Sequence, residues 1–159
     1  MSTLPHVAHE HHERLMARIE EMPAVGKAIL EAPAEELHAK LAELDSWLNG
    51  LLIPHMDAAE ATLYPELERM MQNRHSMKPM RREHEEIRRL VGELSGLIKG
   101  VGEKRPSLGK QIALRRVLYR LYALLEIHAV EEEMYIPLVQ HGITDEASEA
   151  MAAAMKHSG

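Results

Sequence analysis

Residues 114–139, LRRVLYRLYALLEIHAVEEEMYIPLV, decide the fold expected for this chain. Apolar residues recur there at steps of four and three, which places them on one face of a helix. Burying an imidazole and a carboxylate on such a face is costly unless a partner satisfies them. His128 and Glu132 are therefore one turn apart in a buried position and indicate a bound metal. The full face comprises Leu114, Leu118, Leu121, Leu125, His128, Glu132, Tyr135 and Val139.

The bulk composition limits the class of protein. A chain of 159 residues fits one domain, here residues 1–159 with a core at about 5–140 and a tail or short helix in 141–159. The net charge of -6 argues against a nucleic-acid partner. The absence of cysteine excludes disulfides and thiolate metal sites and fits a cytoplasmic location. Neither a signal peptide nor a membrane span of about 20 apolar residues is expected.

Methionine and histidine are unusually frequent in this sequence. The chain has 11 Met and no Phe, so Leu and Met are expected to fill the core. A Met-rich surface for partner binding is the alternative interpretation. The 11 His cluster near the start of the chain and otherwise occur mostly as single residues on predicted helix faces.

Four long helical segments are predicted, and no strand. The first begins near Pro5 and is interrupted at Pro23, and the second runs from Pro33 to about Met71. Pro54 removes a backbone donor and predicts a kink in the middle of the second helix. The third extends from Met77 to about Val101, and the fourth from an N-cap at Ser107 to about Gln140. Short connections make neighbours antiparallel, so the fold class is all-α: an up-down-up-down four-helix bundle, with a short last helix near Asp145–Met155.

Helix lengths bring one histidine from each helix to the same depth. His84 lies about 30 Å before the end of its helix, and His128 lies about 30 Å after the start of the next, at about 1.5 Å rise per residue. The first half repeats this relation with His12 and His55. A single inward histidine usually has a structural role, but four at one level favour a metal site.

Carboxylates and two tyrosines complete the candidate site. Glu132 follows His128 by four residues, whereas Ala59 stands at the equivalent place after His55. Glu60 is one residue further, about 140° away on an ideal helix, and the kink at Pro54 is expected to bring it round. Nitrogen and carboxylate ligands suit iron or manganese better than calcium, and five or six ligands suit a dinuclear site. Three further residues are open to either a structural or a ligand role: Glu131, Tyr64 and Tyr135.

The motifs HEHHERL around His12, PHMDAAEATLYP around His55, REHEEIRRL around His84 and LYALLEIHAVEEEMYIP around His128 resemble a hemerythrin-like protein of the HHE cation-binding type. The resemblance covers roughly residues 5–140. It implies two Fe ions, oxo- or hydroxo-bridged and carboxylate-bridged, with His12, His55, His84, His128 and Glu132 as ligands and Glu60 as the second bridge. Met80 stands where the oxygen carriers have a further histidine, for which His9 or His11 could substitute.

These residues lead to a functional hypothesis with open alternatives. We expect a non-haem di-iron protein that binds O2, H2O2 or NO, with catalase-like consumption of peroxide. An oxygen, nitric oxide or redox sensor, or an iron-handling protein without turnover, is the second reading. A bundle without metal is the third, and it must bury four histidines without ligands. No nucleic-acid or membrane partner is expected, and a partner protein is not identifiable from the sequence.

Overall fold

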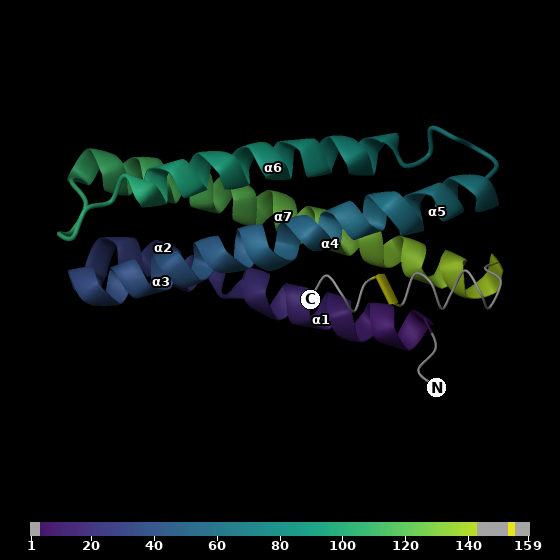
Figure 1. Cartoon of the computed structure of the whole chain (residues 1–159), viewed down its shortest axis with the longest axis horizontal. Coiled ribbons are helices and arrows are strands. Elements are labelled where there is room, and N and C mark those ends of the chain that lie inside the picture. The colour runs from purple at the N-terminus through teal and green to yellow at the C-terminus, as the bar shows by residue number, and fades with distance from the viewer. Residues whose placement is uncertain (1–3, 143–152, 155–159) are drawn as a thin grey trace.

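The computed structural model describes residues 4–142 and 153–154 of the chain, and the described residues form helices without any strand. The predicted all-α bundle is confirmed (Figure 1). The short helix predicted near Asp145–Met155 lies outside the described residues, except for the helical pair 153–154. No helix in the described part combines the length and the apolar character that crossing a membrane would need.

Four antiparallel arms build the bundle, and the two arms of the first half are each interrupted (Figure 1). The third and fourth arms are single helices, α6 (Lys78–Lys99) and α7 (Leu108–Gly142). The first arm is α1 (Leu4–Glu20) followed by α2 (Met22–Glu31); the second is α3 (Ala34–Trp47), η1 (Leu48–Leu52), α4 (Ile53–Ala58), η2 (Ala59–Leu63) and α5 (Tyr64–Met70).

Proline explains where the first two arms are interrupted. Pro23 stands at the start of α2, as the sequence predicted. In the second arm the predicted interruption takes the form of two π-helical turns, η1 and η2. The residue that follows each π turn, Ile53 or Tyr64, directly precedes a proline, so the next backbone donor is missing. The wider turn is the local response, and such turns often occur at functional sites.

The core consists of two apolar clusters on either side of a buried polar layer. The larger cluster fills the end of the bundle that contains α2 and α3. The smaller one lies at the other end and comprises Ala59, Leu63, Tyr64, Leu67, Met77, Met80 and Val139. Along α7 the sequence passes from Leu125 in the larger cluster, through His128 and Glu132, to Val139 in the smaller. The buried Met22, Met56, Met77 and Met80 confirm that methionine contributes to the core.

The loop before α7 joins the ends of the helices at one pole of the bundle. Arg105 donates hydrogen bonds to the carbonyl oxygens of Ile29 at 2.7 Å and Leu30 at 2.9 Å, and a third to Ala32. These are the last carbonyls of α2, which have no partner within their own helix. Ser107 acts as the predicted N-cap, accepting from the Lys110 amide at 3.4 Å. The guanidinium of Arg105 also complements the negative end of the α2 dipole.

Arg105→Ala is therefore expected to destabilise the bundle. It removes three charge-assisted hydrogen bonds and leaves carbonyls of α2 unsatisfied, which corresponds to about 1–3 kcal/mol. Urea unfolding followed by circular dichroism measures the change. Lys104→Ala, an exposed cation in the same loop, is the matched control and should change stability by less than about 0.5 kcal/mol. Equal effects of the two substitutions would contradict the capping role.

Candidate metal centre

The polar layer contains five buried titratable side chains contributed by all four arms. They are His12 from α1, His55 from α4, His84 from α6, and His128 and Glu132 from α7. His84 has no exposed surface, and the others are at most 7% exposed. The four histidines that the helix lengths placed at one depth thus lie in this one layer. Their role as ligands stays a prediction.

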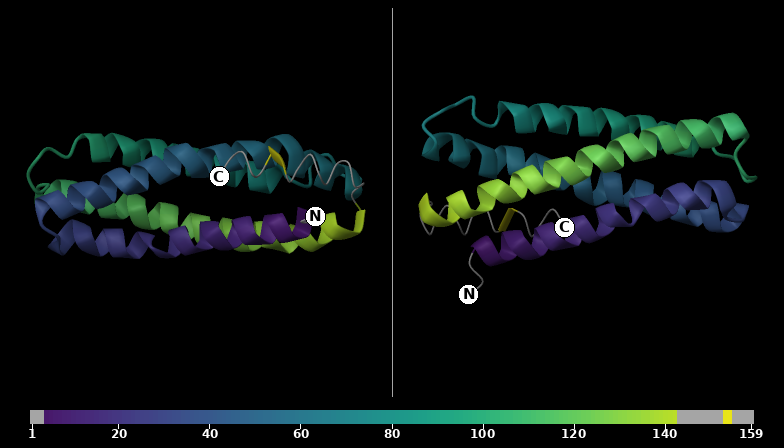
Figure 2. Two further views of the ribbon diagram at one scale, coloured as in Figure 1. Left: turned by 60° about the horizontal axis from the view of Figure 1, so that its bottom comes forward. Right: turned by 180° about the vertical axis from the view of Figure 1, so that it is seen from behind.

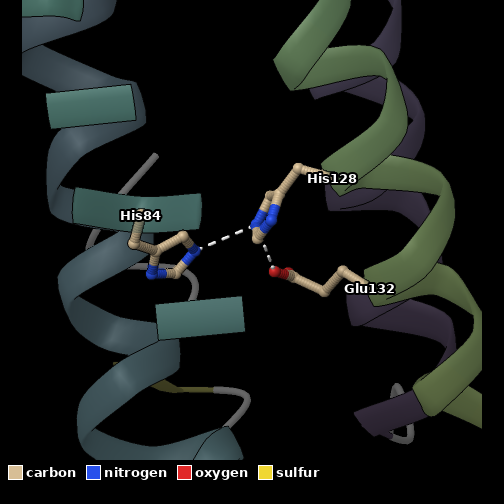
Figure 3. A group of neighbouring side chains, drawn as sticks. All are labelled: His84, His128 and Glu132. Atoms are coloured by element: carbon tan, nitrogen blue, oxygen red, sulfur yellow. Dashed lines mark hydrogen bonds and ion pairs between the residues drawn. The ribbon is translucent and has the colours of Figure 1, made fainter. Parts of the chain in front are cut away.

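His84, His128 and Glu132 form the compact centre of this layer (Figure 3). The Nε2 atoms of the two histidines are 2.9 Å apart, and Nε2 of His128 is 3.1 Å from Oε2 of Glu132. Two nitrogens bound at right angles to one cation, each at about 2.1 Å, would lie about 3.0 Å apart. The separation in the structure therefore fits the donor set of a transition-metal ion.

Glu132 faces two different sets of histidines with its two oxygens. Oε2 faces His128, while Oε1 is 3.5 Å from Nε2 of His55. A carboxylate arranged in this way can serve cations on both of its sides, as a bridging ligand does. One oxygen of this carboxylate thus faces the group formed with His84 and His128, and the other faces His55.

Tyr64 brings a hydroxyl group to the same centre. The side chain is completely buried, and its hydroxyl donates to Oε2 of Glu132 at 3.1 Å and lies 3.1 Å from Nε2 of His84. The π turn η2 directly precedes this residue, which begins α5. A protic group thus points at the atoms best placed to hold a metal. Of the two tyrosines singled out in the sequence, the structure brings only Tyr64 to these atoms.

Two carboxylates hold the outer nitrogens of the central histidines. Nδ1 of His84 is 2.6 Å from Oε1 of Glu60, which also accepts from Arg88 at 3.0 Å. Nδ1 of His128 is 2.6 Å from Oε2 of Glu83. Carboxylates at this position fix the ring orientation and the tautomer that leaves Nε2 for a metal. Glu60, predicted as a ligand, thus contacts the side of His84 that faces away from the centre.

Sequence reasoning missed Glu83. This residue directly precedes His84, so on α6 it lies about 100° from the face that carries the histidine and reaches the neighbouring helix instead. The signal that could have found it is chemical: buried histidines that bind metals usually donate their second nitrogen to a carboxylate. A search for acidic residues beside each predicted histidine would have included it.

The first arm approaches the layer in a different way. Nε2 of His12 donates to the carbonyl oxygen of Ala129 at 2.7 Å, and its Nδ1 is 3.9 Å from a carboxylate oxygen of Glu133. His11, partly buried, has its Nε2 2.7 Å from Nδ1 of His55, and the two rings stack with centroids 4.5 Å apart. Neither ring of this arm contacts Glu132 directly. The side chain of His9 lies outside the described residues.

The remaining candidates lie at the edge of the layer. Glu131 is partly buried and shares a hydrogen bond with Glu83, which raises the pKa of Glu131. Tyr135 is partly buried and packs against the smaller apolar cluster. Met80 is also buried in that cluster, where the oxygen carriers would place a histidine. Among the described residues, no hydrogen bond joins Glu131, Tyr135 or Met80 to the central trio of His84, His128 and Glu132.

Burial and mutual contacts set the charges of the layer. Burial, then the neighbouring His128, lower the pKa of His84 to about 4. Burial also opposes charge on His128, but Glu132 and Glu83 outweigh it and raise its pKa. Burial works against the anion of Glu132 as well, yet hydrogen bonds from His128 and His55 hold its pKa well below the usual range. Burial and the nearby Glu132 raise the pKa of Tyr64, which keeps the hydroxyl protonated.

The charge states of these residues suit a cation site. Glu132 is an anion, and His84 is neutral with a lone pair on Nε2. The two neighbouring carboxylates favour a proton on His128, so positive charge is stabilised at that position. A metal ion would replace that proton, because imidazole ligands bind metals in the neutral form. The residues present therefore fit a redox metal with nitrogen and oxygen ligands.

Comparison with known families points in the same direction. Residues 3–139 match the family model described as the hemerythrin HHE cation binding domain. The match covers the four motifs on which the resemblance in the sequence rested. Comparison with curated proteins and with solved structures gave no significant match.

The metal-free protein should lose stability as the pH falls from about 6.5 to about 4. His84 has its pKa lowered to about 4, so across this window the unfolded chain binds a proton that the folded chain does not. The loss from this residue is on the order of 2–3 kcal/mol. Below about 4.5, protonation of Glu132 adds to it. His128 acts oppositely: its raised pKa stabilises the fold below 6.5, and this contribution is lost as the pH rises through the folded value.

Urea unfolding of the metal-free protein at several pH values measures this dependence. His84→Gln should flatten the slope between about pH 6.5 and 4, because the substituted side chain does not titrate. His75→Gln, which alters an exposed histidine in the turn before α6, is the matched control and should leave the slope unchanged. An unaltered slope in His84→Gln would contradict the assignment.

Proposed function

The chain belongs to the hemerythrin HHE cation-binding domain family, and we propose that its polar layer holds two irons that consume hydrogen peroxide. The observation that carries the proposal is the Tyr64 hydroxyl, completely buried and 3.1 Å from both a metal-competent nitrogen and the Glu132 carboxylate. A proton donor at this place suits a ligand whose O–O bond is to be broken. Reversible carriage of O2 needs no such breakage.

We propose that His84, His128 and Glu132 form the first metal position, and that His55 with the second oxygen of Glu132 forms the other. The inward Nε2 atoms of all three histidines support this division. His11, whose Nε2 is 2.7 Å from Nδ1 of His55, and His12, once its hydrogen bond to Ala129 is released, are the candidates to complete it. Glu60 and Glu83 orient His84 and His128 through their Nδ1 atoms.

The chemistry proposed needs no outside reductant. When bound, a pair of irons would give two electrons to one H2O2 and regain two from a second, so that two H2O2 yield two H2O and one O2. The residues of the chain do the rest. Tyr64 holds a proton beside the reacting oxygen, and Glu132 keeps the two positions at a fixed spacing. The apolar clusters on both sides limit access of water, which strengthens these electrostatic interactions.

Met80 supports peroxide chemistry over oxygen carriage. It is 2% exposed and packs in the smaller cluster, so this position supplies no nitrogen ligand. Fewer nitrogen ligands leave more of the coordination to oxygen donors and to incoming small molecules. The test is metal analysis and an optical spectrum of iron-loaded protein, together with oxygen evolution from H2O2. Reversible O2 binding without any peroxide consumption would overturn the proposal and favour oxygen carriage or sensing.

Glu132→Gln and Glu60→Gln should separate a ligand from an orienting residue. Glu132→Gln removes a charge shared by both positions and should reduce bound iron from two per chain to one or none. Glu60→Gln should retain two irons and weaken their affinity by about 10- to 100-fold, as loss of an outer carboxylate usually does. Metal analysis after dialysis against graded chelator measures both. Loss of iron from Glu60→Gln equal to that from Glu132→Gln would assign Glu60 as a ligand.

Tyr64→Phe should slow peroxide consumption while the iron content is kept. Removing a positioned proton donor usually costs about 10²–10⁴-fold in rate. Tyr135→Phe is the matched control, since this residue packs on the smaller cluster, and its rate should change by less than about threefold. Oxygen evolution at equal iron content measures the effect. If Tyr64→Phe also lost iron and its visible charge-transfer band, the phenol would be a ligand instead.

A further inference from the structure

The outer face of α7 carries an apolar stripe that no part of the described structure covers. In the right-hand view of Figure 2, α7 lies nearest the viewer and runs along the length of the molecule. Met134 is 70% exposed, and Ile112 is 56% exposed. The stripe comprises Leu108, Ile112, Tyr119, Ile127, Val130, Met134 and Leu138, with the exposed Ala123 at its middle.

These residues lie on one side of the helix, opposite the buried face. At 100° per residue, the whole stripe falls within about 60° of the direction of Ala123. The buried Leu114 and Glu132 point about 180° away. The same sector also holds Arg116, about 20° from Ala123, and Arg120 and Glu126 at its two edges. α7 is therefore largely apolar on two faces, although a helix on the surface of a globular protein needs only one. A row of exposed apolar residues edged by charges indicates an interaction surface.

The charges on α7 divide at the same midpoint. Its first part, residues 108–120, carries Lys110, Arg115, Arg116 and Arg120 and no acidic residue. Its later part, residues 121–142, carries Glu126, Glu131, Glu132 and Glu133 and no Lys or Arg. Cations near the start of a helix and anions near its end oppose the helix dipole. The arrangement is therefore unfavourable for α7 alone, and a partner of opposite polarity would offset it.

We propose that the outer face of α7 pairs with the same face of a second copy of this chain, antiparallel and centred on Ala123. In this arrangement the basic half of each α7 lies beside the acidic half of its partner. Residues equidistant from the centre share a level: Leu108 with Leu138, Ile112 with Met134, and Tyr119 with Ile127. In the same register Val130 packs on the stem of Arg116, and Arg120 is level with Glu126. The small Ala123 occupies the crossing point, where side chains from both helices are closest. Parallel pairing would place basic beside basic and acidic beside acidic.

The dimensions of the stripe set the expected strength of the dimer. It extends about 45 Å along a helix that is about 10–12 Å wide, so each copy would bury about 500 Å². The total of about 1,000 Å² is at the lower limit for a specific interface. The dimer should therefore dissociate on dilution in the micromolar range and weaken as salt is added.

Sedimentation velocity of the full chain at about 1–200 μM tests the pairing. The unaltered protein should shift from monomer to dimer across this range. Ala123→Glu places two like charges at the crossing and should raise the dissociation constant at least about tenfold. Ala39→Glu, at an exposed position of α3, is the matched control and should dimerise normally. A monomer at every concentration, or a dimer indifferent to Ala123→Glu, would overturn the proposal.

Cross-linking tests the antiparallel orientation, because the chain has no cysteine of its own. A short bismaleimide should join two copies of Ala123→Cys. It should also join Ile112→Cys to Met134→Cys in a mixture of the two proteins, but neither variant to itself. Self-linking of Met134→Cys would overturn the orientation. A monomer in which Met134→Cys resists thiol reagents would assign the face to residues 143–159 instead and overturn the dimer.

Discussion

The buried carboxylate of Glu132 is the constraint on which the rest of the structure depends. An isolated anion in an apolar core is too costly to survive, so groups that donate or carry positive charge must surround it. His128, His55 and Tyr64 do so, and they come from three segments of the chain. The second arm and α7 itself therefore supply the direct partners of this carboxylate, while His12 and His84 lie in the same buried layer. The two apolar clusters stabilise the bundle on either side of the polar layer. The contribution of the polar layer to the free energy of unfolding depends on pH and on bound metal.

The second arm shows how local backbone structure decides which side chains reach that layer. Each of its two π turns ends two residues before a proline, where the helix has lost a donor. Between the turns His55 is buried in the polar layer, and Ala59, the first residue of η2, is buried in the smaller cluster. Glu60 is displaced to the outer nitrogen of His84, and Tyr64 becomes the next inward polar residue of this arm. The two halves of the chain therefore serve the site unequally: the second half supplies a carboxylate to its centre, and the first half supplies a phenol.

The sequence predicted the features that follow from helix periodicity and length. The four histidines lie in one buried layer because the arms have matching lengths, and Glu132 joins the layer because it follows His128 by one turn. What it could not predict depends on side-chain rotation about fixed helices. Three contacts are of this kind, because rotating the side chain by a few tens of degrees would break each of them. They are the hydrogen bond from His12 to Ala129, the contact of Glu60 with the far side of His84, and the contact of Glu83 with His128. The sequence predicted an interruption at Pro54 but not its π geometry, because periodicity alone does not distinguish a kink from an added residue.

The metal site and the outer face of α7 are linked through the charges of one helix. The layer requires Glu132, and Glu131 and Glu133 flank it at the end of α7, where the helix dipole is already negative. Glu133 is near His12, which offsets part of this cost, whereas the contact of Glu131 with Glu83 brings two carboxylates together and adds to it. In the proposed dimer, the Lys110 and Arg116 half of a second α7 would offset more of it. The acidic end of α7 would then both build the metal site and select an antiparallel partner. A substitution that changes the net charge of either half of α7 should therefore change both the metal affinity and the dimer affinity.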